Sequence, residues 1–357
     1  MKSVKWLLYA PVLFAILILS GCDGDYRKSA QGGFSEILVV MDSDEWDGPV
    51  AEAIRETFGE ERMTLPRPEA KYDLRFMDIK TTRDLEFAKS FRNTIFAAPI
   101  DEQSNVADFI RAVMSEDIKT RIEDGRNFAF PLKDRWFRDQ WTLFLSSGNE
   151  EALANKIRQD GSSLVQSLDQ VERERWTREV YRRGEQEHLA DSLREKLGFG
   201  IRVQHDYRLG VDTTGFVSMR RFLHDNDRWI WFAYKEDISD KSEVTEEWIH
   251  AVRDSLNRSF IRGTREDSYI TTEYRRAIET RNVTMNGYPA LETRGTWTMV
   301  NDLMGGPFLN YVVFDEEKER VYMMEFAQFA PRYSKRRFMN QFEAMAYTFH
   351  TDREEDS

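Results

Sequence analysis

Four acidic side chains follow the first apolar stretch of the sequence closely enough to form a cation site. They are Asp42, Asp44, Glu45 and Asp47. Ca²⁺ prefers several carboxylate oxygens, but this spacing lacks the glycine and the late glutamate of a calcium loop. We therefore favour a turn between a strand and a helix, in which Asp47 caps the helix and the acids stabilise its positive end.

The histidines and the single cysteine do not form a zinc motif. The five histidines are scattered, no pair has the spacing of a helical zinc site, and the cysteine is Cys22 near the N-terminus. Nucleophile, phosphate-loop and dinucleotide motifs are also lacking. We predict no metal, no cofactor and no catalytic residue, although an enzyme assembled from distant residues stays possible.

The string Met304-Gly-Gly-Pro-Phe308 is the most distinctive in the sequence. Paired glycines permit positive φ angles and proline restricts the next residue, which suits a tight loop beside a ligand. Aromatic rings and an always-ionised arginine near this loop would add flat contacts and charge. The alternative is a turn or bulge that enters a strand at Asn310. The candidate ligand-binding residues are Arg294, Trp297, Gly305, Gly306 and Phe308.

A basic cluster stands out against the acidic whole. Arg332, Lys335, Arg336 and Arg337 precede the last predicted helix. They suit a phosphate, a lipid headgroup or an acidic partner. We favour the simpler interpretation, a solvated face that pairs with the protein's own acids.

The N-terminus has the pattern of a secretory signal. Two lysines precede an apolar stretch, Trp6–Leu19, that is shorter than the roughly 20 apolar residues that a transmembrane helix needs. The following string, Leu19-Ser-Gly-Cys22, resembles the lipobox of bacterial lipoproteins, in which the cysteine is lipidated. We predict a signal peptide over 1–21, lipidation of Cys22, and a membrane as partner through the lipid anchor.

Composition excludes some classes of partner. The net charge of −12 becomes −14 without the two lysines of residues 1–21. An acidic body disfavours nucleic acid and anionic lipid surfaces. With 41% hydrophobic and 32% charged residues, the chain is globular, and its length suggests two domains.

Hydrophobic periodicity predicts an α+β protein with two α/β sandwich-like domains joined by a long helical segment. We expect a flexible, lipidated tether over 22–33 and an acidic tail over 352–357. Between them we place an N-terminal α/β domain (34–148), a helical connector (149–198) and a β-rich C-terminal domain (199–351).

The expected elements alternate in the first domain. Strands are expected at 36–41, 72–79, 94–98, 128–130 and 141–145, and helices at 50–58, 82–91 and 106–114. In the second domain we expect helices at 245–260 and 334–347. Its expected strands are 201–203, 208–211, 216–222, 229–234, 283–285, 288–294, 296–300, 310–315 and 320–329.

Two resemblances follow from these strings. Met304-Gly-Gly-Pro-Phe308, Arg294-Gly-Thr-Trp297 and Ile37-Leu-Val-Val-Met-Asp42 resemble the Bacteroidetes lipoprotein family called domain of unknown function 4837. That resemblance implies a cell-envelope location, expected at the outer membrane facing the periplasm or the cell surface, and no assigned activity. The element order of the second domain, ending at Phe342–Phe349, resembles the PsbP/Mog1-type fold, which transfers no function.

Two functions remain open from the sequence. The favoured one is a non-enzymatic envelope lipoprotein that binds a protein, a glycan or a small ligand. The alternative is a membrane-anchored hydrolase that acts on an envelope polymer through dispersed carboxylates. Such a hydrolase needs two carboxyl groups at a set separation in a cleft.

Overall fold

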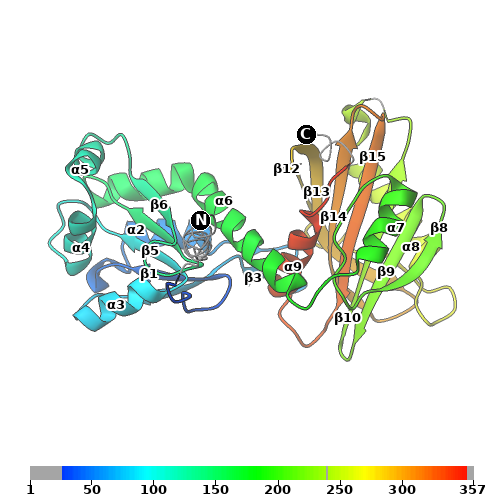
Figure 1. Ribbon diagram of the computed structural model, residues 1–357, viewed down its shortest axis with the longest axis horizontal. Helices are drawn as coiled ribbons and strands as arrows, with labels where there is room; N and C mark the ends of the chain where they lie inside the picture. The colour runs from blue at the N-terminus through cyan, green and yellow to red at the C-terminus, as the bar shows by residue number, and fades with distance from the viewer. Residues whose placement is uncertain (1–25, 239, 352–357) are drawn as a thin grey trace, which may run out of the picture.

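The protein consists of two domains that are bridged by one long helix (Figure 1). The computed structural model describes residues 26–238 and 240–351. The predicted signal peptide, Cys22 and the acidic tail lie outside these described residues. Both domains mix helices and strands, as predicted for an α+β protein. None of the helices in the two described ranges combines the length and hydrophobicity that a membrane span needs.

The first domain is built on a five-stranded sheet whose order is β4-β1-β5-β7-β6. The first four strands are parallel and β6 is antiparallel to β7. Ile37 to Val40 are buried, as the continuous apolar run predicts for a strand covered on both faces. The strands are β1 (Glu36–Val40), β4 (Asp73–Met77), β5 (Asn93–Ala97), β6 (Ala129–Lys133) and β7 (Trp141–Leu145).

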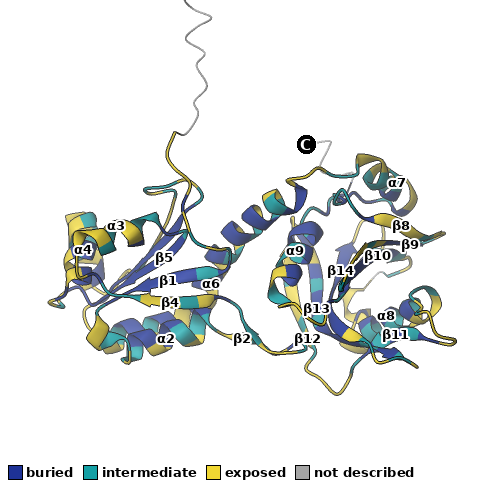
Figure 2. Ribbon diagram, turned by 90° about the horizontal axis from the view of Figure 1, so that it is seen from below, coloured by how far each residue is buried: buried dark blue, intermediate teal, exposed yellow. Residues whose placement is uncertain are grey.

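Helices cover both faces of this sheet and complete a three-layer sandwich (Figure 2). One core lies between the sheet and helices α2 and α6. The other lies between the sheet and helices α3, α4 and α5. The helices are α2 (Pro49–Phe58), α3 (Thr82–Ser90), α4 (Asn105–Val113), α5 (Glu116–Glu123) and α6 (Glu150–Tyr181); a 3₁₀ turn, η1, spans Ser43–Glu45.

The second domain is an eight-stranded antiparallel sheet. Seven strands follow the order β11-β13-β14-β15-β10-β9-β8, and β12 pairs with β13 beside β11. The strands are β8 (Arg208–Thr213), β9 (Phe216–Leu223), β10 (Asn226–Lys235), β11 (Tyr269–Thr272), β12 (Glu279–Met285), β13 (Tyr288–Val300), β14 (Gly305–Asp315) and β15 (Arg320–Phe329).

Three helices cover the two faces of the second sheet. Helices α7 (Glu187–Leu197) and α9 (Arg336–Ala346) pack on one face. Helix α8 (Glu246–Phe260) packs on the other, beside the 3₁₀ turn η2 (Lys241–Glu243). The apolar side of α8 holds Ile249, as its helical spacing predicts.

The predicted connector is shared between the domains. Leu153 to Val171 of α6 belong to the core of the first domain, whereas Val180 and Tyr181 belong to that of the second. Gly184, with φ of 99°, separates α6 from α7. Gly198, with φ of 77°, ends α7 in the left-handed conformation that favours glycine.

A short ladder extends the first domain toward the second. It pairs β2 (Glu61–Arg62) with β3 (Glu69–Ala70). The Glu69 carboxylate accepts hydrogen bonds from the backbone N–H groups of Lys335 and Arg336 at 2.7 and 3.0 Å. This ladder therefore holds the beginning of α9 against the first domain.

The predicted flexible tether is wrong for Lys28–Gln31. The N–H of Ala30 donates to the Arg138 carbonyl at 2.9 Å, and that of Gln31 donates to the Ser90 carbonyl at 2.9 Å. Ala30 is buried. The small polar residues of this segment suggested a flexible linker, but its backbone pairs with the first domain. Backbone pairing of this kind leaves no pattern in the sequence.

Other differences concern short or merged elements. The predicted strand at 201–203 is not a strand, although Ile201 and Val203 are buried in the core. The two strands predicted at 288–294 and 296–300 are one, β13, because Gly295 leaves room for the Phe308 ring on the neighbouring strand. The short elements β11 and α5 were not predicted.

Candidate functional site

The predicted ligand loop is mostly part of the core. Trp297 and Phe308 are each 1% exposed, so neither ring offers a flat surface to a ligand. Gly305 and Gly306 begin β14 rather than form a loop, and the turn consists of residues 301–304. The structure thus supports the second interpretation of this string, a turn that enters a strand.

The reason for glycine at position 306 differs from the predicted one. Neither Gly305 nor Gly306 has a positive φ. A Cβ atom on Gly306 would instead lie 2.0 Å from the Gln328 carbonyl oxygen. Glycine is therefore required by the close approach of β14 and β15, which sequence spacing does not reveal.

Arg294 lies in a chain of buried ion pairs. Its guanidinium contacts Glu292 at 2.7 Å and Glu343 at 2.8 Å. Burial raises the pKa of the Glu292 carboxyl, but the charges of Arg294 and Arg281 outweigh burial and hold that pKa well below its usual range. Arg294 is thus committed to neighbouring acids of its own domain.

The acidic cluster after β1 forms no cation site. Asp42 caps the 3₁₀ turn by accepting from the Asp44 N–H at 3.0 Å. Asp47 does not cap α2, because Gly48 is the N-cap residue and Pro49 begins the helix. In the described part of the chain, no group of three or more His, Cys, Asp or Glu side chains has the geometry to hold a metal ion.

One member of this cluster meets a carboxyl group from another strand end. Glu45 follows β1 and Glu150 follows β7, and the parallel strands bring both to the same edge of the sheet. Burial and the hydrogen bond with Glu45 raise the pKa of Glu150 to about 7. Neither carboxyl group lines the large cleft described below.

This pair predicts a pH dependence of stability. The pKa of Glu150 is about 7 in the folded protein against a usual 4.5. The folded state therefore holds an extra proton, and stability falls as pH rises from the lower value to the higher one. Glu150→Gln should abolish this fall and raise the free energy of unfolding at pH 8. The increase should be only about 1 kcal/mol, because solvent screens the interaction between the two carboxyl groups.

The measurement is urea unfolding at pH 4, 6 and 8. Glu151→Gln, an exposed neighbour on the same helix, is the matched control and should behave as the wild type. Equal stability of Glu150→Gln and wild type at pH 8 would show that the two carboxyl groups do not share a proton.

The basic cluster before α9 pairs with the protein's own acids, as favoured from the sequence. Arg336 forms an ion pair with Asp73 and donates to the Ala70 carbonyl at 2.7 Å. Arg332 contacts Asp225 at 3.1 Å. The cluster serves partly to join α9 to the first domain.

The principal cavity is a cleft between the two domains, with a volume of about 1440 Å³. This exceeds the range of about 300–1,000 Å³ that is typical of small-molecule sites. Its walls are the outer face of α6 and the β12–β13 hairpin. The cleft therefore has the size of a site for an extended ligand.

Small polar residues form the α6 wall. Gly161, Ser162, Ser163, Gln166 and Ser167 line the cleft along two turns of the helix. Gly161 is required by packing, because a Cβ atom there would lie 2.9 Å from the Thr57 methyl group. The short side chains of Ser162, Ser163 and Ser167 leave open space between this part of the helix and the opposite hairpin, whereas the longer side chains of Arg158 and Arg173 line the cleft on either side of them.

Apolar and polar side chains alternate on the opposite wall. Asn282, Val283 and Thr284 of β12 line the cleft together with Leu291 and Phe314. Asn282 and Thr284 are exposed, and Val283 is half-buried. This wall is the edge of the second sheet.

Ion pairs close the floor of the cleft. Lys71 contacts Asp169 at 2.6 Å, and the Tyr72 hydroxyl donates to Asp169 at 2.6 Å. Arg173 of α6 contacts Glu343 of α9 at 3.7 Å and lies 3.6 Å above the Tyr347 ring. Glu343 in turn pairs with Arg294, so an ionic chain crosses from the first domain to the second.

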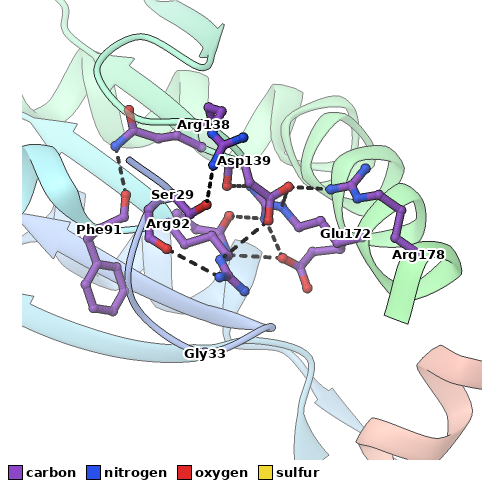
Figure 3. Close-up of polar contacts among 12 residues, drawn as sticks. Ser29, Gly33, Phe91, Arg92, Arg138, Asp139, Glu172 and Arg178 are labelled. Atoms are coloured by element: carbon purple, nitrogen blue, oxygen red, sulfur yellow. Dashed lines mark hydrogen bonds and ion pairs between the residues drawn. The ribbon is translucent and has the colours of Figure 1, made fainter. Parts of the chain in front are cut away.

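A polar network at the other side of α6 holds the helix against the first sheet (Figure 3). Arg175 is 1% exposed and donates to Asn93 at 2.6 Å and to Glu172 at 2.6 Å. Glu172 also accepts from the Ser35 N–H at 2.9 Å. The Asp139 carboxylate forms an ion pair with Arg178 and lies 3.9 Å from the guanidinium of Arg92.

This network fixes the position of the cleft wall. Arg175 and Glu172 point into the first domain, which leaves the opposite face of α6 toward the cleft. Asn340 of α9 donates to the Ser35 hydroxyl at 3.1 Å and adds the second domain to the network. The amino-terminal segment, α6 and α9 thus meet at one junction.

The sequence contains a signal for each wall of the cleft. Residues 161–167, Gly-Ser-Ser-Leu-Val-Gln-Ser, are unusually small and polar for the middle of a long helix. Asn286-Gly287 is a strong hairpin signal that defines β12. What the sequence does not give is that these two segments face each other.

The solved structures that are weakly similar to this chain include two of Mog1 proteins. One is the Ran-binding protein Mog1p of Saccharomyces cerevisiae, with 8% identity, a TM-score of 0.28, and coverage of 43% of this chain and 90% of that chain. A point mutant of protein Mog1 gives the same identity, TM-score and coverage. No curated protein matches the chain.

The comparisons with family models match each domain separately. Residues 30–181 match the family described as domain of unknown function DUF8532. Residues 186–348, which form most of the second domain, match the one described as domain of unknown function DUF4837. The second domain is therefore similar to this family, as its glycine-proline string and its Arg-Gly-Thr-Trp string indicate. The string Ile37-Leu-Val-Val-Met-Asp42, which also suggested that family, lies in the segment that matches DUF8532 instead.

Proposed function

We propose that the protein is a lipid-anchored component of the cell envelope that binds a partner in the cleft between its domains. The observation that carries the proposal is the cleft itself, about 1440 Å³ between α6 and the β12–β13 hairpin. Ion pairs and a polar network hold the two walls in place before any ligand is bound. Preorganised walls lose less conformational entropy on binding.

The hydrolase alternative has less support. The carboxyl pair with a raised pKa, Glu45 and Glu150, lies away from the cleft. Of the four acidic residues that line the cleft, Glu56, Glu60, Asp169 and Glu343, three form ion pairs: Glu56 with Arg158, Asp169 with Lys71 and Glu343 with Arg173. A binding module remains the function that best fits this arrangement.

A photocrosslinker placed in the cleft tests the proposal. We expect p-benzoylphenylalanine at Gln166, on the cleft wall, to give specific adducts in intact cells that make the full chain. The matched control is the same residue at Gln103, which is exposed and outside the cleft. Adducts should disappear when Ser163→Trp also fills the cleft. Equal labelling from both positions, or no adduct from Gln166, would contradict the proposal.

The anchor is tested separately. We propose that Cys22 carries the lipid, on the basis of Leu19-Ser-Gly-Cys22. Cys22→Ala should give a protein without acyl chains that leaves the membrane fraction, as measured by mass spectrometry of the intact protein and by cell fractionation. Acyl chains on the Cys22→Ala protein would refute the assignment.

A further inference from the structure

We infer that the cleft binds an extended peptide segment of a partner protein, which adds as a strand to the outer edge of β12. This inference rests on the proposed function, because it takes the cleft to be the binding site. It goes further by naming the chemistry of the ligand, a polypeptide backbone in the extended conformation.

The turn at the tip of the hairpin determines which backbone groups of β12 are free. Asn286 and Gly287 have φ angles of 47° and 84°, which define a two-residue turn of the primed type. Met285 and Tyr288 flank this turn and form a hydrogen-bonded pair. Hydrogen-bonded and non-hydrogen-bonded pairs alternate along an antiparallel ladder, so residue 283 is also hydrogen-bonded to 290, and residue 281 to 292. The backbone groups of Thr280, Asn282 and Thr284 therefore point away from β13.

The outer edge of β12 has no strand partner in the described part of the chain. β12 pairs with β13 alone. Asn282 and Thr284 both line the cleft. Their outward N–H and C=O groups form a regular row of donors and acceptors, and the complement of such a row is another strand.

The other edge strands of the two large sheets in the described residues are all shorter than β12, and β4 has five residues. β8 has an irregular register between Leu209 and Asp212. β11 has four residues and is tied to α8, where the Thr272 N–H donates to Asp254 at 2.9 Å. β6 contains Pro131 and Lys133. β12 has seven residues in register and contains no proline, lysine or bulge. Its charged residues are Glu279 at its beginning and Arg281, which is ion-paired with Glu292 of β13.

The cleft has room and apolar contacts for such a strand. Adjacent strands lie about 4.8 Å apart. The opposite wall, with Gly161, Ser162 and Ser163, projects little into this space. Successive side chains of an added strand would point to opposite faces of the sheet, one toward Val283 and the other toward Leu291.

Charge and ring exposure favour a peptide over an acidic glycan. All five basic residues that line the cleft are already ion-paired, namely Lys71, Arg158, Arg173, Lys241 and Arg281. Its aromatic rings are also covered, since Phe314 is 7% exposed and Tyr347 lies under Arg173. Sugar rings bind to open aromatic faces, which this cleft does not offer.

The test compares proline with alanine at the same position. Peptides enriched from a display library of linear dodecapeptides on the full chain are synthesised and their Kd is measured. Asn282→Pro removes the outward N–H and places a ring on the edge, and it should weaken binding at least about tenfold. Asn282→Ala keeps the backbone group and should weaken binding far less than Asn282→Pro does. Neither change removes a hydrogen bond to β13, so both variants should keep the wild-type melting temperature.

A second measurement does not depend on the folding of the proline variant. The enriched peptide is synthesised in two forms, with N-methyl groups at its odd or at its even backbone positions. Only one of the two forms should lose its binding to the wild-type protein. Equal weakening by Asn282→Ala and Asn282→Pro, or no effect of N-methylation, would overturn strand addition.

A linear glycan-chain fragment of peptidoglycan is the competing probe. If that fragment binds in the cleft and no peptide does, the strand-addition inference is wrong while the proposed binding function stands. If neither probe binds and the crosslinker at Gln166 captures nothing, both are wrong.

Discussion

Arg253→Met is expected to destabilise the second domain by about 3–5 kcal/mol, because it leaves a buried carboxylate without its partner. Arg253 and Glu325 are both fully buried, and their side chains lie 2.6 Å apart. The same guanidinium donates to the Thr272 hydroxyl at 2.6 Å and lies 3.6 Å above the Phe308 ring. Chemical denaturation of the full chain measures the loss.

A double variant separates the ion pair from packing. Arg253→Met with Glu325→Met removes both charges, and it should recover much of the stability that Arg253→Met loses. Burial already raises the pKa of Glu325 in the wild type, although the Arg253 charge opposes it. Without Arg253 the pKa rises further, so the single variant should gain stability as pH falls and the carboxyl group takes up its proton. A double variant less stable than the single one would contradict this account.

Arg294→Ala should also cost about 3–5 kcal/mol, and it decides between the two interpretations of the glycine-proline region. The Arg294 side chain is 13% exposed and pairs with Glu292, which is 1% exposed, and with Glu343. Removal of the guanidinium leaves two acids in a buried site that also holds the Tyr311 hydroxyl, 2.7 Å from Glu292. A ligand-contact role would instead predict an unchanged melting temperature.

Arg281→Ala is the matched control for Arg294→Ala. Arg281 contacts the same Glu292 oxygen at 2.7 Å, but its side chain is 58% exposed. Its loss should therefore lower the free energy of unfolding by less than about 1 kcal/mol. If both variants lost the same stability, burial would not be the property that makes Arg294 essential.

Local sequence patterns predicted most elements of the fold. The apolar run at Ile37–Val40, the helix spacing of α8 and Gly198 at the end of α7 are all where the patterns placed them. These features depend on interactions between near neighbours in the chain. Periodicity and helix-ending chemistry are sufficient to reveal them.

The surroundings of the candidate site depend on contacts between distant residues, which the sequence does not show. Trp297 and Phe308 have types that suit ligand binding, but burial is decided by α8 and by the strands beside them. Gly306 was expected to serve a turn, whereas the Gln328 carbonyl on β15 excludes a side chain there. No local pattern shows that Ser163 of α6 faces Asn282 of β12 across a cleft.

Residue-resolved amide hydrogen exchange of the free full chain tests the central claim most directly, because it reports whether the cleft contains an open strand edge. The account predicts fast exchange at the N–H groups of Asn282 and Thr284 and strong protection at those of Arg281 and Val283, which bond to β13. Protection of Asn282 and Thr284 equal to that of Val283 would show that the edge is already covered, and it would contradict the account.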